Sequence, residues 1–228
     1  MRKTISPWLN REFILLSGEA RGSGSVEQQT GELFERFETE LSACNLSLEN
    51  TVRTRIFAAD KEAREQATHA RSKILSGKRK AASSSYISTS HFDSNARVAL
   101  DLLAMRPSRR GAAREPVDFD PPRLYVSQLR YDSLAFVSGF TSELDRLENQ
   151  VPAVLADIDE ALKAASTSWE HLARLTVYLS RTQNLEVLKN LLRKANRLEL
   201  TKTEFEFVDG FARDTGLLEA EATASIAG

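Results

Sequence analysis

The segment Phe13-Ile-Leu-Leu-Ser-Gly18 decides the fold, because it recurs as Leu134-Ala-Phe-Val-Ser-Gly139, 121 residues further along the chain. The same offset relates Arg53-Thr-Arg-Ile-Phe-Ala58 to Arg174-Leu-Thr-Val-Tyr-Leu179. Self-similarity that keeps one register over about 80 residues is the mark of a repeat architecture. The sequence therefore predicts a duplicated domain.

Length and composition agree with two globular domains. The 228 residues allow two domains of about 110 residues each. Hydrophobic residues make up 41% and charged residues 28%, and the formal net charge is −1. This near-balance argues against a strongly cationic nucleic-acid-binding protein. Without an apolar run of roughly 20 residues, we expect no association with a membrane.

Cysteine and histidine are scarce. A lone Cys44 forms no internal disulfide, which favours a reducing cytoplasm. The three histidines, His69, His91 and His171, are too scattered for a usual zinc site. We therefore predict neither a metal site nor a cofactor.

Each copy has the same pattern of elements. A short strand ends in Ser-Gly, and an amphipathic helix follows, marked in the first copy by Leu33, Phe37, Leu41 and Cys44. The next strand is rich in β-branched and aromatic residues. A second helix and two closing strands complete each copy, with the second helices at residues 62–75 and 185–198. Such alternation predicts an α+β fold with two helices on one face of each sheet.

The copies are joined by a segment rich in proline. Four prolines and a glycine fall within residues 106–122, which predicts a connector without regular structure. We accordingly divide the chain into a first domain at 1–106, a linker at 107–122 and a second domain at 123–228. The linker arginines are Arg106, Arg109, Arg110 and Arg114. They give the only support for RNA binding, and a solvated connector is the preferred interpretation.

The ordered motifs of the second copy resemble the Rid/YjgF family, the reactive intermediate deaminases. That family has an early Tyr, then Val-Ser-Gly, a helix, a Val-Tyr-Leu-like strand and a final Val-Glu-Ile-Glu-Ala-type strand. The corresponding segments here are Tyr125-Val-Ser-Gln, Phe136-Val-Ser-Gly139, Ser168-Trp-Glu, Leu175-Thr-Val-Tyr-Leu179 and Leu218-Glu-Ala-Glu-Ala-Thr223. The chain resembles two such units in tandem.

The resemblance implies two chorismate-mutase-like domains, each a mixed β-sheet with two helices packed on one face. Family members trimerise with their sheets inward and place active clefts between neighbouring domains. A chain with two copies is therefore expected to form a homotrimer of two stacked layers, a pseudo-hexamer. The chorismatases, which resemble two such domains joined, offer a precedent.

The resemblance also assigns a site to the second copy. A Glu on the family's final strand positions or activates water, which makes Glu219 the predicted catalytic residue and general base. Tyr125 and Ser138 match the residues that line the cleft, and Glu221 lies two residues on, on the same strand face. The first copy has Ala99 in place of the catalytic Glu, with Asp101 at the following acidic position.

The arginine that clamps a substrate carboxylate in the family is missing. Ser84 and Glu204 stand at its position in the two copies, and neither reproduces a bidentate guanidinium. Either the substrate is not a simple 2-imino acid, or another cation has taken over the clamp. The candidate cations are Arg213 and Arg97. Alternatively, Glu204 and Glu206 receive an amine or a guanidinium.

Three functions follow as hypotheses. The first is a hydrolase or deaminase of a small reactive imine, enamine or related C–N compound, with an atypical substrate. The second is a catalytically inactive ligand-binding or regulatory scaffold, and the third, less favoured, is a ribonuclease-like RNA-binding protein. For Glu219 and Glu221 themselves, the alternative to a site is a solvent-facing pair on an edge strand, a common device against aggregation.

Overall fold

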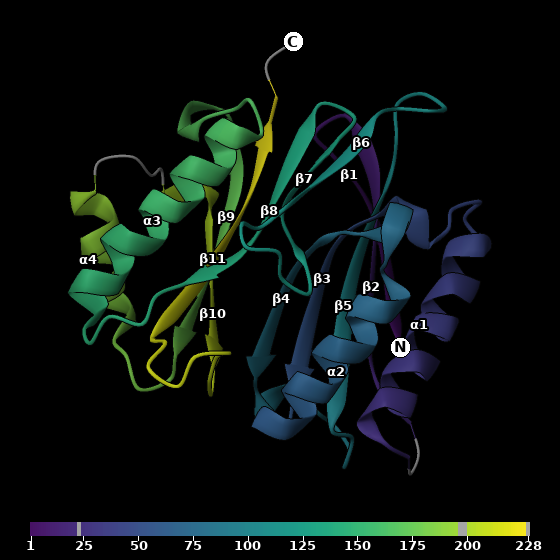
Figure 1. The fold of residues 1–228 in the computed structure, drawn as a ribbon, viewed down its shortest axis with the longest axis horizontal. Helices are drawn as coiled ribbons and strands as arrows, with labels where there is room; N and C mark the ends of the chain where they lie inside the picture. Colours follow the sequence, from purple (N-terminus) through teal and green to yellow (C-terminus); the bar gives the residue numbers. More distant parts are fainter. Residues whose placement is uncertain (22–23, 196–199, 227–228) are drawn as a thin grey trace.

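The computed structural model describes residues 1–21, 24–195 and 200–226 and folds them into two α+β units (Figure 1). The first sheet has the strand order β1-β2-β5-β3-β4, and the second has the order β10-β9-β11-β8-β7-β6. The first unit comprises β1 (Arg2–Trp8), β2 (Arg11–Glu19), α1 (Val26–Ser42), β3 (Thr51–Ala58), α2 (Lys61–Ile74), β4 (Ala82–Ile87) and β5 (Val98–Arg106). The second comprises β6 (Arg114–Asp118), β7 (Val126–Tyr131), β8 (Leu134–Thr141), α3 (Leu147–Ala164), β9 (Leu172–Ser180), α4 (Leu185–Lys194), β10 (Thr203–Val208) and β11 (Leu218–Ser225).

The two sheets have one topology, which confirms the predicted α+β class. In the first unit the last strand, β5, lies between β2 and β3, and β3 pairs in parallel with the edge strand β4. In the second unit β11 lies between β8 and β9, and β9 pairs in parallel with the edge strand β10. A short 3₁₀ turn precedes β3 and β9, at Leu48–Asn50 and Trp169–His171 respectively. The strand β6 is the one element of the second sheet without a counterpart in the first.

The linker is more regular than the sequence predicts. Residues 114–118 form β6, which pairs antiparallel with β7 at the sheet edge. Pro116 is tolerated because an edge strand leaves one row of backbone groups without a ladder partner. Arg114 fixes the same segment to the first unit, donating from Nε to the Glu49 carbonyl at 2.9 Å and from Nη2 to the Thr51 carbonyl at 2.6 Å. The prediction of a connector without regular structure is therefore wrong for these residues.

Two helix boundaries also differ from the predicted pattern. The first helix begins at a capping box, in which Ser25 and Gln28 satisfy each other's backbone N–H groups, and it ends at Ser42. Cys44 therefore lies in the turn after the helix, half-buried, and not on its apolar face. The fourth helix ends at Lys194, and the predicted extension over residues 196–198 lies outside the described residues.

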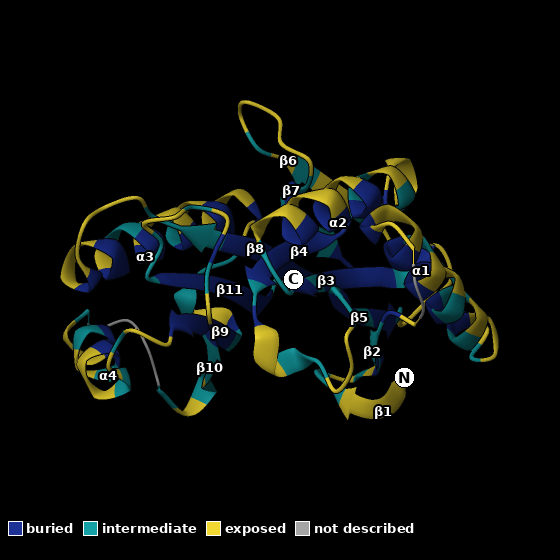
Figure 2. Cartoon of the chain, turned by 90° about the horizontal axis from the view of Figure 1, so that it is seen from below, coloured by how far each residue is buried: buried dark blue, intermediate teal, exposed yellow. Residues whose placement is uncertain are grey.

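The helices cover the outer faces of the sheets, and the inner faces of the two sheets meet (Figures 1 and 2). Each helix pair encloses an apolar core with its own sheet, and the strands are buried between these layers. Two smaller clusters combine residues from both sheets. One contains Phe13, Met105, Leu129, Tyr131 and Phe136, and the other contains Phe57, Tyr86, Ala99, Tyr178, Val208 and Phe211. The units are thus joined by a shared core.

The edge strand β4 packs across β7 and β8 of the other unit. We call this contact the seam; it is formed by α2 and β4 of the first unit and by β7, β8 and β11 of the second. A backbone bridge between Ile87 and Gly210 closes it at the end of β4. No described helix is long and apolar enough to cross a membrane.

Candidate functional site

Glu219 and Glu221 lie on β11, an interior strand that pairs with β8 on one side and β9 on the other. Both side chains are buried, with 5% of Glu219 and 1% of Glu221 exposed. The alternative of a solvent-facing pair on an edge strand is therefore wrong. Buried carboxyl groups are costly unless they are paired or protonated, and the two residues meet that cost in different ways.

Glu221 is held by two arginines from the first unit. Arg55 donates from Nε to its carboxylate at 2.8 Å and contacts the same oxygen through Nη2. The Nε of Arg53 lies 3.4 Å from the other oxygen, and the Ser84 hydroxyl donates to it at 3.3 Å. Burial raises the pKa of Glu221, but the charges of Arg53 and Arg55 and these hydrogen bonds outweigh it and lower the pKa below its usual value. Glu221 is thus a fixed anion.

Glu219 has no ion pair with any described residue. Burial raises its pKa to about 8, and the negative charge of Glu221 adds to that shift. The neighbouring Tyr86 hydroxyl and the more distant charges of Arg64 and Arg71 act in the opposite direction. With this pKa the carboxyl is roughly nine-tenths protonated at pH 7. Glu219 is therefore mostly protonated in the resting site, and its predicted role as a general base stays a prediction.

The backbone beside Glu219 is shaped to admit its side chain. The pairing of β11 with β8 changes register between Ala220 and Ala222, so that Ser138 and Gly139 together oppose Glu221. This two-against-one arrangement is a β-bulge, a feature common next to active sites. A Cβ atom placed on Gly139 would lie 2.0 Å from Oε1 of Glu219. Gly139 is therefore required for the observed position of the carboxyl group.

Two arginines of α2 complete the charge of the seam, and sequence reasoning missed both. Arg71 is 2% exposed, donates to the Ser84 carbonyl at 2.7 Å, and lies 6.0 Å from the ring centre of Tyr125. Arg64 donates to the Ser85 hydroxyl at 3.2 Å. Burial lowers the pKa of Arg71 to about 10, which leaves it charged at neutral pH. The sequence carried one signal for them. Arg64 and Arg71 are seven residues apart, which places both on the buried face of α2 with the small residues Ala63, Ala67 and Ala70.

The cations proposed from the sequence lie in other pairs. Arg213 pairs with Glu143, and Arg97 pairs with Asp60 at 2.9 Å. The clamp position itself, at Ser84, is contacted by Arg71 from α2. A cation therefore reaches the strand at which the family carries its arginine, but it comes from a helix.

The remaining predicted residues divide between the seam and the far edge. Tyr125 lies in the seam, where burial and then the Glu219 charge raise its pKa. The Ser138 hydroxyl is fully engaged there, because it donates to the Val126 carbonyl at 2.6 Å and accepts from the Ser83 backbone N–H at 2.9 Å. Glu204 and Glu206 are on the edge strand β10, paired with Arg174 at 3.5 Å and His91 at 3.1 Å.

A cavity of about 240 Å³ opens at the outer end of the seam. Its wall includes Arg71, Ser83 and Tyr125, together with the cations Lys80 and Arg123. Arg71 and Tyr125 line this opening, and both are close enough to Glu219 to interact with its charge. Deeper in the seam, the Tyr86 and Tyr178 rings stack with centres 4.0 Å apart, and both hydroxyls are buried. The described part of the chain holds no cluster of three His, Cys, Asp or Glu side chains placed to bind a metal.

Comparison with known proteins identifies a solved structure with the same fold over almost the whole chain. A solved chorismatase structure matches 97% of this chain and 79% of its own, with 13% identity and a TM-score of 0.66. The chain shares its fold. This match, with the repeated topology, confirms the predicted tandem arrangement at the level of the fold.

Proteins of the YjgF family match one half of the chain. One from Mycobacterium tuberculosis has 22% identity over 50% of this chain and 100% of its own, with a TM-score of 0.45. One from Neisseria meningitidis has 19% identity over 51% of this chain and 97% of its own, with a TM-score of 0.44. No protein-family model and no curated protein sequence matches the chain.

Proposed function

We propose that the seam is an acid–base site that hydrolyses a C=N bond, or the related enamine, in a small molecule. The observation that carries this proposal is the buried Glu219, which forms no ion pair with a described residue and whose pKa of about 8 lies near neutral pH. General acid–base groups work best when their pKa is close to the working pH. The opposite shift of Glu221, two residues away, leaves one carboxyl group free to exchange protons and one fixed.

The proton balance of such a reaction needs only Glu219. The protonated carboxyl donates its proton to the imine nitrogen, which makes the carbon electrophilic and leaves Glu219 as a carboxylate. That carboxylate then takes a proton from the water that attacks the carbon, giving a carbinolamine and restoring the acid. The restored acid then protonates the carbinolamine nitrogen, and the resulting carboxylate takes the hydroxyl proton as the C–N bond breaks. Ammonia or an amine leaves with the carbonyl product, and Glu219 is again protonated. Donor and base are thus the same group at successive steps.

Arg71 and Tyr125 are suited to orient the substrate. Both line the outer cavity, the Arg71 guanidinium lies 6.0 Å from the centre of the Tyr125 ring, and Arg71 keeps its charge at neutral pH. A buried guanidinium favours a carboxylate or a polarised carbonyl. We therefore propose that Arg71 performs the binding role for which β4 lacks an arginine. The substrate is expected to carry an anionic or carbonyl group near the C=N bond.

The test is ammonia release from a panel of small imines, with and without a neighbouring carboxylate. The wild-type chain is expected to hydrolyse at least one imine, and Arg71→Met is expected to raise KM by about tenfold or more with little change in kcat. Arg79→Met serves as the control, since Arg79 lies outside the seam and pairs with Glu38. No turnover of any imine by the wild-type chain would reject the proposal.

One observation favours the alternative of an inactive ligand-binding scaffold. Glu219 is only 5% exposed, and the Ser138 hydroxyl beside it is already engaged by two backbone groups. A site that binds without turnover would retain a ligand at stoichiometric occupancy. Calorimetry with the same panel distinguishes the two functions, because saturable heat without ammonia release supports the scaffold.

The assembly stays a prediction. The homotrimer expected from the family resemblance is measured by light scattering of the purified chain. A mass of three chains supports it, and a stable monomer at micromolar concentration contradicts it.

A further inference from the structure

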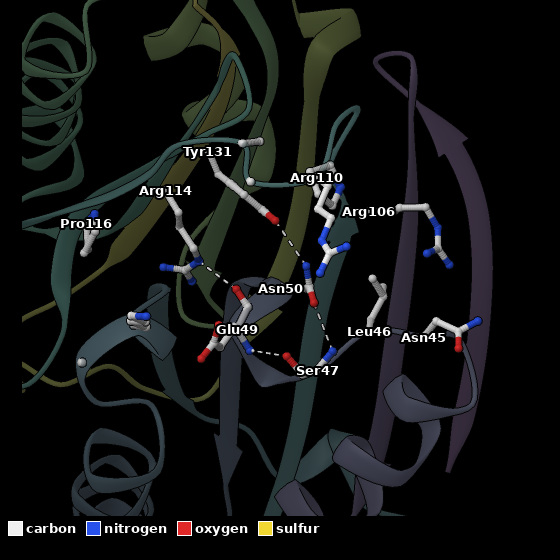
Figure 3. Close-up of a pocket in the computed structure, with 15 residues that line it drawn as sticks. Asn45, Leu46, Ser47, Glu49, Asn50, Arg106, Arg110, Arg114, Pro116 and Tyr131 are labelled. Atoms are coloured by element: carbon white, nitrogen blue, oxygen red, sulfur yellow. Dashed lines mark hydrogen bonds between the residues drawn. The ribbon is translucent and has the colours of Figure 1, made fainter.

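A second and larger cavity lies where the linker meets both units (Figure 3). Its volume is about 870 Å³, within the range of cavities that hold small-molecule ligands. The first unit contributes the turn after α1 at residues 45–50 and the loop at 77–78. The linker contributes residues between 106 and 116, and the second unit contributes Tyr131. This cavity shares no lining residue with the opening at the seam.

The wall of this cavity is strongly basic. Four of its residues are cationic and only Glu49 is acidic; the cations are Lys78, Arg106, Arg110 and Arg114. This bias is local, because the whole chain has a formal net charge of −1. A concave wall of one sign concentrates counter-ions of the other.

Two of the four cations support the wall. Arg106 pairs with Glu12 at 2.9 Å and donates to the Cys44 carbonyl, and Arg114 donates to the Glu49 and Thr51 carbonyls. Lys78 and Arg110, in contrast, form no ion pair with any described residue. They are the charges available to a ligand. In Figure 3 the Arg110 side chain extends from the linker toward Asn50 of the first unit.

The wall is ordered by hydrogen bonds that cross between its parts. Asn50 donates from Nδ2 to the Tyr131 hydroxyl at 3.2 Å and accepts from the Ser47 backbone N–H at 3.0 Å, as Figure 3 shows. Gly77, next to Lys78, has a φ of +58°, a conformation that favours glycine and sets the course of this loop. A site of this kind loses little conformational entropy when a ligand binds.

We propose that this cavity binds a small polyanion carrying two or more phosphate or carboxylate groups, held by Lys78 and Arg110. The volume, the excess of cations and the two unpaired charges support this assignment. An RNA strand needs an extended basic surface, whereas these cations surround a single concavity in a chain without net positive charge. The proposal is independent of the chemistry proposed for the seam.

The test uses inorganic pyrophosphate as the probe and the full-length chain, with binding measured by calorimetry at fixed ionic strength. The double variant Lys78→Ala/Arg110→Ala is expected to weaken binding by about tenfold or more. The matched control is Arg79→Ala/Arg109→Ala, which removes the same charge from the adjacent positions. Arg79 and Arg109 do not line this cavity, and their removal is expected to change the dissociation constant by less than about twofold.

Three results of this experiment would contradict the proposal. No binding of pyrophosphate by the wild-type chain overturns the proposal, and so does an equal loss in the test and control variants. A single-stranded RNA that binds more tightly than pyrophosphate, and that both variants weaken alike, would replace the site with a diffuse nucleic-acid surface. Melting curves without pyrophosphate establish that each variant is folded.

Discussion

The inner faces of the two sheets, which are equivalent in the repeat, have diverged. In the second unit the bulge at Ser138 and Gly139 makes room for Glu219, which is covered by α2 and β4 of the first unit. In the first unit β2 and β5 pair without a bulge, and Ala99 replaces the glutamate within an aromatic cluster. Duplication has thus left one face shaped around a carboxyl group and the other filled by apolar packing.

The equivalent strands β3 and β9, each next to the edge strand of its sheet, have diverged in the complementary sense. Arg53 of β3 is 3% exposed and donates to Thr223, Val137 and Ala222 of the other unit at 2.7–3.0 Å. Its counterpart Arg174, at the repeat offset of 121, lies on the surface against the Trp8 ring. The first unit therefore acts mainly through β3 and β4, and the second mainly through the inner face of its sheet. We infer that a chain with two copies carries one complete site.

The largest effect is expected from removing the proton carrier. Glu219→Gln keeps the size of the side chain but cannot exchange a proton, so kcat is expected to fall by about 10²–10⁴. Asp101→Asn is the matched change on the first unit's face and is expected to leave kcat within about threefold. Ammonia release measures both. Equal losses in the two variants would show that the faces are still equivalent.

The next effect concerns the equivalent arginines of β3 and β9, Arg53 and Arg174. Arg53→Met leaves Glu221 with one cationic partner and three acceptors of the second unit without the Arg53 donor, so the free energy of unfolding is expected to fall by about 3–5 kcal/mol. Arg174→Met, on the surface, is expected to change it by less than about 1 kcal/mol. Urea denaturation gives both values. Similar values for the two variants would contradict the claim that Arg53 joins the two units and that Arg174 does not.

The two Ser-Gly motifs give a smaller contrast. Gly139→Ala brings a methyl group into Glu219 and is expected to cost about 2–3 kcal/mol of stability. At Gly18 the nearest atom to an added Cβ is 3.5 Å away, an ordinary contact, so Gly18→Ala is expected to stay within about 0.5 kcal/mol. Thermal melts of the two variants test this. A neutral Gly139→Ala would mean that Glu219 is not held against the bulge.

The pH dependence of stability separates the two carboxyl groups. The folded pKa of Glu219 is raised to about 8, so the folded chain binds the extra proton below that pH and loses stability as the pH rises toward it. Relative to Glu219→Gln, the wild-type chain is expected to lose roughly 2 kcal/mol between pH 6 and pH 8. Glu221, whose pKa is lowered, has the opposite sign and contributes stability that is lost only in acid. Parallel stability curves for wild type and Glu219→Gln would contradict the raised pKa.

The repeat was sufficient to predict the fold. A strand, a helix and a strand spaced at one offset in both copies predict two α+β units, because each face has to bury its own apolar pattern. The linker strand could not be predicted, since Pro116 is acceptable only at an edge, and β6 lies at one. The end of α1 before Cys44 depends on a turn whose signal is weak in the sequence.

The site was predictable only in part. Glu219, Glu221 and Tyr125 follow from the order of the motifs, and the structure places all three at the seam. The partners of the arginines were beyond such reasoning, because Arg53, Arg55, Arg64 and Arg71 reach the second unit's carboxyl groups from the first unit. Contacts between residues about 150 positions apart depend on how the units pack, which no local pattern encodes.

The central claim is that Glu219 is a buried acid that remains protonated at neutral pH. Carboxyl-carbon NMR of the ¹³C-labelled chain, compared with Glu219→Gln to assign the signal, measures this directly. The structure predicts a titration midpoint of about 8 for the Glu219 carboxyl. A midpoint near 4.5, the ordinary value for a glutamate, would contradict the claim and, with it, the proposed role of the seam.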